Sequence, residues 1–94
     1  MLKDEVLSFL KQHKKFIQKN FGVKKIYLVG SVARGEEKEK SDIDIIVEME
    51  SDFNNFFNLK YFLEKNLKKE IDLANLKSIR HYILKKMQKD MINV

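Results

Sequence analysis

The sequence predicts an α/β (α+β) fold in which helices and strands follow one another in the order α-β-α-β-α-β-α. Apolar residues recur at spacings of three and four in three long segments, as they do on one face of a helix. Short apolar runs of strand character separate these segments. The 94 residues contain no proline and no linker-like stretch, so we assign residues 1–94 to a single domain with one modest core.

The first half of the chain predicts a helix, a strand and a short second helix. The first helix is expected over residues 2–20, where apolar side chains line one face and lysines the other. Gly22 ends it, because glycine commonly follows the last helical turn. A strand over residues 25–29 comes next. The short helix is expected over residues 32–34, with the Ser31 side chain as its N-terminal cap.

The second half predicts two strands and two helices. Strands are expected over residues 42–49 and 70–74, with a helix over residues 53–68 between them. A last helix is expected from residue 78 to about residue 92. Its apolar residues and methionines recur at steps of four, which predicts a stripe packed in the core.

Four further expectations concern side chains of the helices. Ser51 or Asp52 is expected to cap the helix that starts at residue 53. Five apolar residues of that helix are expected to share one face: Phe53, Phe56, Phe57, Leu63 and Leu67. Phe62 lies about half a turn from this face, at about 100° per residue, so it either is exposed at a protein interface or packs under a neighbouring element. His13 is expected to be a half-buried helix residue, since no second histidine or cysteine lies nearby to share a metal.

The composition favours a cytoplasmic protein with an anionic partner. Nineteen basic and 14 acidic residues give a net charge of +5, which suits a nucleotide, a nucleic acid or an acidic protein surface. The lysines are scattered, however, so most of them are expected simply to face solvent. Without cysteine the chain can form neither disulfides nor a thiolate zinc site. No apolar run approaches the ~18 residues of a membrane span, and no secretory signal is recognisable, so no membrane association is expected.

The stretch from Gly30 to Asp44 carries the clearest chemical signal. Residues i and i+2 of a strand share a face, so Asp42 and Asp44 point the same way. Two neighbouring carboxylates repel each other unless a cation neutralises them, and hard oxygen ligands suit magnesium with phosphate as a further ligand. Gly30 permits a sharp turn and a close ligand approach, and Arg34 adds a positive charge. These residues predict metal-bound carboxylates that face a triphosphate.

The sequence motif in this stretch resembles the signature of the DNA polymerase beta-type nucleotidyltransferase superfamily. The matching residues are Gly30-Ser31, Arg34-Gly35 and Ser41-Asp42-Ile43-Asp44, placed between two strands. In its short length and in the residues Gly30–Gly35, the chain is similar to members of the minimal nucleotidyltransferase branch, the MntA-like antitoxins of HEPN/MNT toxin–antitoxin pairs. The resemblance implies nucleotide binding by Gly30, Ser31, Arg34 and Ser41.

The same resemblance implies a third acidic residue, which Asp72 supplies. If Asp72 joins Asp42 and Asp44, the second and third strands must run parallel, because each carries its acids near its start. The helix between them is then the crossover, and the first strand runs antiparallel to the second. The result is a small mixed three-stranded sheet packed by helices. The alternative is that Asp72 is a surface acid at a strand edge.

The activity implied by the resemblance is magnesium-dependent transfer of AMP from ATP to a tyrosine hydroxyl of a HEPN ribonuclease toxin, with release of pyrophosphate. One magnesium ion would be held by Asp42 and Asp44. A second, about 3.5–4 Å away, would be shared with Asp72 and lower the pKa of the attacking hydroxyl. Asp72 could instead accept the proton.

Three alternatives stay open. A non-enzymatic antitoxin would act by binding and occlusion, although the intact acids argue against a relic site. Nucleotidyl transfer could instead reach an RNA 3′ end or a small-molecule hydroxyl, although no acceptor domain is visible. A basic nucleic-acid-binding module is the third alternative. No nucleic-acid motif is recognisable, so direct nucleic-acid binding is not expected.

Overall fold

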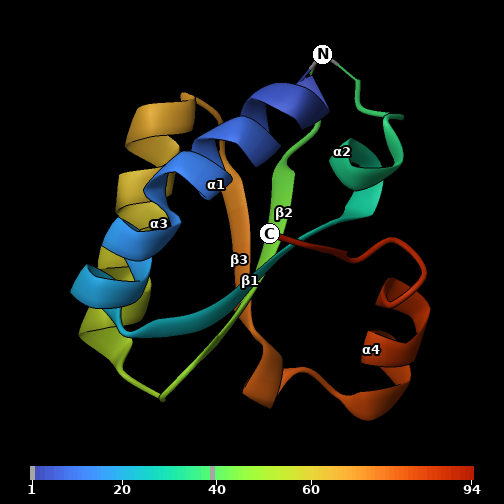
Figure 1. Cartoon of the computed structure of the whole chain (residues 1–94). Coiled ribbons are helices and arrows are strands. Elements are labelled where there is room, and N and C mark those ends of the chain that lie inside the picture. Colours follow the sequence, from blue (N-terminus) through green and yellow to red (C-terminus); the bar gives the residue numbers. More distant parts are fainter. Residues whose placement is uncertain (1, 39) are drawn as a thin grey trace.

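The structure is a computed structural model that describes residues 2–38 and 40–94 (Figure 1). Helices and strands follow one another as the sequence predicts, and a fourth strand is added at the end. The elements are α1 (Leu2–Phe21), β1 (Val23–Val29), α2 (Gly30–Arg34), β2 (Ile43–Met49), α3 (Phe53–Leu67), β3 (Ile71–Asn75), the 3₁₀ turn η1 (Leu76–Ser78), α4 (His81–Met87) and β4 (Ile92–Asn93).

The sheet is mixed, with the strand order β3-β2-β1-β4. β2 and β3 run parallel and α3 connects them, whereas β1 runs antiparallel to β2, so the predicted strand directions are confirmed. The register places Asp44 opposite Asp72 on β3 and opposite Val29 on β1. The two strands with the acids therefore begin side by side at one end of the sheet.

The core lies between the sheet and the helices α1 and α3, which both cover one face of it (Figure 1). Alternate strand residues point into this core and are at most 8% exposed: Ile26, Leu28, Ile43, Ile45, Val47, Ile71 and Leu73. Because neighbouring strand residues point to opposite faces, Asp44 and Asp72 lie on the face that α1 and α3 leave open.

The end of the chain differs from the prediction of one long helix over residues 78–92. α4 is short and has no buried residue, and the chain then turns into β4, which pairs antiparallel with β1. The Val94 N–H donates to the Ile26 carbonyl oxygen at 2.9 Å, and Lys14 Nζ donates to the Val94 carbonyl oxygen at 2.9 Å. Backbone hydrogen bonds to the open edge of β1 thus stabilise an extended end of this segment, although its apolar spacing favours a helix. The predicted core stripe is wrong: Met87 and Met91 are only partly buried.

The expectations for single helix residues had mixed outcomes. Asp52 does cap α3, since its side chain accepts from the Asn55 N–H at 3.0 Å. Ser31 does not cap α2, because it lies inside the first turn and Val29 occupies the cap position. Phe62 packs under three rings of α1, at centroid distances from 5.2 to 6.0 Å from Phe9, Phe16 and Phe21. His13 is half-buried, as expected, and its Nδ1 donates to the Phe9 carbonyl oxygen at 2.9 Å.

The predicted apolar face of α3 is only partly a core face. Leu59 and Leu63 are buried, but Phe53 is 77% exposed and Phe57 is 47% exposed. The start of α3 therefore extends beyond the sheet that it packs against. In the part of the chain that the structure describes, no helix is both long and apolar enough to cross a membrane.

Candidate active site

The site begins at the turn that ends β1. Gly30 has a φ of +77°, in the left-handed region that L side chains rarely adopt. A Cβ at this position would lie 3.1 Å from Asp44 Cγ and would overlap the Asp44 Oδ2 atom. Glycine is thus required twice, for its backbone conformation and for the room that it leaves to the Asp44 carboxylate.

Asp44 and Asp72 form a close carboxyl pair. They face each other across the parallel β2–β3 pair, and Asp72 lies close enough to Asp44 to raise its pKa. Burial raises the pKa of Asp44, and the charges of Asp72 and Asp42 raise it further, whereas the positive charge of Arg34 lowers it. Such like-charge crowding disfavours the doubly ionised state unless a cation is present.

Asp42 is less closely attached to this pair. It precedes β2, its side chain is exposed, and its charge reaches Asp44. Among residues 2–38 and 40–94, no three His, Cys, Asp or Glu side chains come close enough together to hold one metal ion. The structure therefore brings two of the three expected acids together and leaves Asp42 beside them.

The carboxyl pair fits a hard divalent cation. Asp44 and Asp72 offer only oxygen donors, and the missing side chain at Gly30 makes room for the Asp44 carboxylate itself. Magnesium is typically bound through one or two carboxylates and completes its shell with water and phosphate oxygens. Two aligned carboxylates are therefore sufficient protein ligands for one such ion.

Arg34 lies near the site but is paired elsewhere. Its Nε is 3.0 Å from Glu36 Oε2, and its NH1 group is 2.9 Å from Asp90 Oδ2. Hydrogen bonds to these two carboxylates raise the pKa of Arg34, so it stays charged. Asp90 lies in the turn between α4 and β4, 56 positions further along the chain. Sequence reasoning missed it, because no local pattern links the two positions.

The two serines of the motif differ in their surroundings. Ser31 follows Gly30 directly and is half-buried at the start of α2. Ser41 accepts a hydrogen bond from the Lys38 N–H at 2.8 Å, so its hydroxyl closes the loop before β2. Ser41 also lines a small hollow beside Asp42, together with Lys40, Lys69 and Glu70. Its predicted contact with the nucleotide would have to coexist with this loop bond.

Comparison with known proteins adds a second line of observation. A model of the nucleotidyltransferase domain family matches residues 10–94. A protein of Methanocaldococcus jannaschii, provisionally named a protein adenylyltransferase, is 41% identical over 95 residues that cover 96% of this chain and 95% of that protein. Protein adenylyltransferase MntA of Thermococcus cleftensis is 37% identical over 93 residues, 97% of this chain and 94% of its own. A solved structure, a toxin–antitoxin with AMP-PNP, has a TM-score of 0.71 at 23% identity and covers 99% of this chain and 72% of that chain, which is a likeness of fold.

Proposed function

The chain belongs to the nucleotidyltransferase domain family, and on that premise we propose that it is an antitoxin that transfers AMP from ATP to a tyrosine hydroxyl of a HEPN ribonuclease toxin. The observation that carries the proposal is the Asp44–Asp72 carboxyl pair at the start of β2 and β3, with Asp44 packed against Gly30. The names of its relatives support a protein as the acceptor. The fold shared with a toxin–antitoxin that holds an ATP analogue supports the pairing with a toxin.

The proposed reaction is a displacement at the α-phosphorus. The acceptor hydroxyl oxygen forms a bond to the α-phosphorus, and the bond from that phosphorus to the oxygen bridging to the β-phosphate breaks. Pyrophosphate leaves with the electron pair, and the hydroxyl proton passes to Asp72 or to solvent. In this family of reactions catalysis rests mainly on positioning and on neutralising charge.

Each residue of the site has a role in this proposal. Magnesium, held by Asp44 with Asp42 and Asp72, would neutralise phosphate charge and lower the pKa of the attacking hydroxyl, with two ions in all. Gly30 leaves room for the Asp44 carboxylate that would hold the metal, and Ser31 would bind the phosphates. Arg34 would turn from its carboxylates to the terminal phosphates. Its present ion pairs are exposed, so solvent screens them and the exchange costs little.

The direct test is the transfer of label from ATP labelled at the α-phosphate. The protein is incubated with magnesium in a lysate of its source organism, beside the Asp42→Asn variant, and polypeptides are separated from RNA. Glu50→Gln is the matched control, because it removes an exposed carboxylate that follows the end of β2 opposite to Asp44 and does not line the site. Label on a polypeptide, kept in the control and lost in Asp42→Asn, is the expected result. Label on RNA alone would refute a protein acceptor.

Occlusion without catalysis is the second candidate. The observation in its favour is the exposed position of Asp42 outside the carboxyl pair. If the Asp42→Asn protein binds ATP and still neutralises the toxin in cells, neutralisation does not need transfer. Loss of neutralisation in Asp42→Asn, with toxin binding retained, would exclude occlusion.

A further inference from the structure

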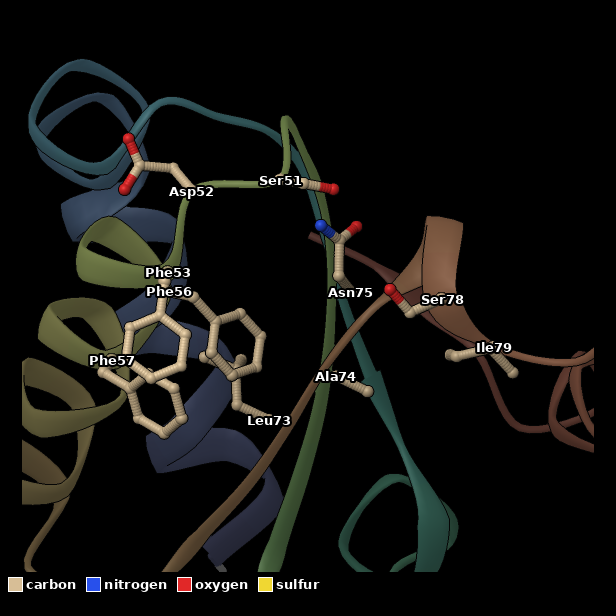
Figure 2. A pocket seen from close by; sticks show the side chains of 10 residues that line it. All are labelled: Ser51, Asp52, Phe53, Phe56, Phe57, Leu73, Ala74, Asn75, Ser78 and Ile79. Carbon is tan, nitrogen blue, oxygen red and sulfur yellow. The ribbon is translucent and has the colours of Figure 1, made fainter.

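An apolar groove opens at the outer edge of the sheet, between the start of α3 and the end of β3 (Figure 2). Its volume is about 550 Å³. Phe53, Phe56 and Phe57 of α3 form one wall, and the end of β3 with Ser78 and Ile79 forms the other. Asp52 is the only charged side chain among the ten that line it. We call this the β3 groove.

The groove exposes aromatic side chains in a segment that carries no charge. Phe53 is 77% exposed and Phe57 47% exposed, and their rings lie 4.5 Å apart between centroids. The residues from Phe53 to Leu59 carry no charge. Exposed aromatic residues in a patch depleted of charge are typical of the centre of a protein interface.

β3 is the outer strand of the sheet, so one of its edges faces the groove. The Glu70 carbonyl oxygen accepts from the Ile43 N–H of β2, whereas the Ile71 N–H points the other way and donates to Glu64 Oε2 at 3.1 Å. Alternate residues of a strand direct their backbone groups to opposite sides. Leu73, two residues after Ile71, therefore presents its N–H and C=O to the open edge, where Leu73 lines the groove.

β3 links the groove to the candidate site. Asp72, Leu73, Ala74 and Asn75 are consecutive residues, and at about 3.3 Å per residue the groove extends roughly 10 Å from Asp72. A segment that paired with this edge would have side chains on both faces of the sheet. One of them would share the face of Asp72, and its sequence neighbours would point toward the phenylalanines.

We propose that the acceptor protein docks here by an uncharged, extended segment that pairs with the open edge of β3. This inference rests on the proposed function. The hydroxyl-bearing residue lies opposite Asp72, on the face of the carboxyl pair, and apolar residues one and three positions away fill the β3 groove. Strand addition of this kind takes affinity from backbone hydrogen bonds and specificity from alternate side chains.

The chemistry of the groove argues against other occupants. A nucleotide or a nucleic acid needs cations, and the one charged lining residue is Asp52. A second copy of this chain would bring together two molecules that each carry a charge of +5. An uncharged polypeptide segment meets no such repulsion. Its apolar side chains can pack against the phenylalanines, and its backbone can hydrogen-bond to the edge of β3.

The first test is the binding of a defined peptide, measured by fluorescence anisotropy. The probe is a labelled, uncharged peptide with a central tyrosine and valine or leucine one and three positions from it. The Phe57→Ser protein is expected to bind at least about tenfold more weakly, the effect typical of an interface anchor. Tyr61→Ser is the matched control, because Tyr61 is an exposed aromatic residue of the same helix outside the groove, and it should bind like the unaltered protein.

Backbone pairing is tested with two N-methylated forms of this peptide. Methyl groups on one alternate set of amides face β3 and should abolish binding, whereas methyl groups on the other set should leave it intact. Equal binding of both forms, no binding of the parent peptide, or equal losses in Phe57→Ser and Tyr61→Ser would each overturn the proposal. So would a dimer of this chain that Phe57→Ser disrupts, detected by sedimentation without peptide.

Labelling with α-labelled ATP separates this inference from the proposed function. If the unaltered protein labels a polypeptide, Phe57→Ser should raise the KM for that polypeptide about tenfold and leave ATP binding unchanged. An unchanged KM refutes the docking site and leaves the proposed function standing. If no polypeptide is labelled but the peptide binds with the expected dependence on Phe57, the proposed function fails while the docking site stands.

Discussion

Replacing Gly30 by alanine places a methyl group against the Asp44 carboxylate. The new Cβ would lie 3.1 Å from Asp44 Cγ and 3.2 Å from Asp44 Cβ, and it would overlap Oδ2. Favourable contacts between such atoms need about 3.5–4.0 Å, so the carboxylate has to move by about 1 Å. The carboxylate is the movable end of a side chain, and it can shift without displacing the backbone.

Gly22→Ala is the matched control. Gly22 has a φ of +69°, close to the +77° of Gly30, but a Cβ there would lie in ordinary contact with Asn55 Nδ2, at 3.9 Å. Each substitution therefore places alanine in the left-handed region at a cost of about 1–2 kcal/mol. Because this strain is common to both, we expect similar losses of unfolding free energy in the two variants. Transfer activity should differ, since a misplacement of about 1 Å at a reacting centre can cost about 100-fold.

The assay combines thermal unfolding with the rate of α-label transfer at a temperature where both variants are folded. Gly30→Ala should transfer at about one hundredth of the rate of Gly22→Ala, at a melting temperature within a few degrees of it. If both variants transfer at equal rates, the Asp44 carboxylate does not need the place that Gly30 leaves for it, and the site geometry described here does not govern the reaction.

Further predictions concern charge and capping. Without metal, Asp44→Asn should stabilise the fold relative to the unaltered protein by up to about 1 kcal/mol at neutral pH, because it removes repulsion from Asp72. Because the pKa of Asp44 is raised in the native chain, ionising this carboxyl group costs the unaltered protein stability. The stability difference in favour of Asp44→Asn should therefore grow as pH rises from about 4 and vanish below it. Unfolding at several pH values measures this difference. Added magnesium and ATP should stabilise the unaltered protein but not Asp44→Asn in the same melts. Asp52→Ala should cost about 1 kcal/mol in denaturant unfolding through loss of the α3 cap, and a loss as large in Asp52→Asn would contradict that reason. Asp90→Asn should change stability by less than about 1 kcal/mol but tighten ATP binding in a titration, because Arg34 no longer has to leave that carboxylate; weaker binding would contradict this.

The centre of the fold could be predicted because local and chemical signals agreed. Alternation around Ile43 and Ile45 placed Asp44 on the open face, and the need for two acids to meet required parallel strands. The observed register, with Asp44 opposite Asp72, is the one that this reasoning demands. The short spacing between Gly30 and Asp44 likewise brought a turn and a carboxylate together from one contiguous stretch.

The features that the sequence did not predict depend on contacts between positions far apart in the chain. Residues 78–92 carry a helical pattern, but the open edge of β1 takes the end of this segment as β4. Arg34 pairs with Asp90 across the same long separation. Phe57 has the spacing of a core residue, and its exposure follows from where the sheet ends rather than from its own helix. No local sequence pattern predicts any of these three outcomes.

Nucleotidyl transfer is distinguished from phosphoryl transfer by comparing ATP labelled at the α-phosphate with ATP labelled at the γ-phosphate, in parallel incubations with the acceptor polypeptide. Nucleotidyl transfer predicts label on a tyrosine of that polypeptide from the α-phosphate and none from the γ-phosphate, with release of labelled pyrophosphate in the second case. Label transferred from the γ-phosphate, or no label from either, would contradict the account.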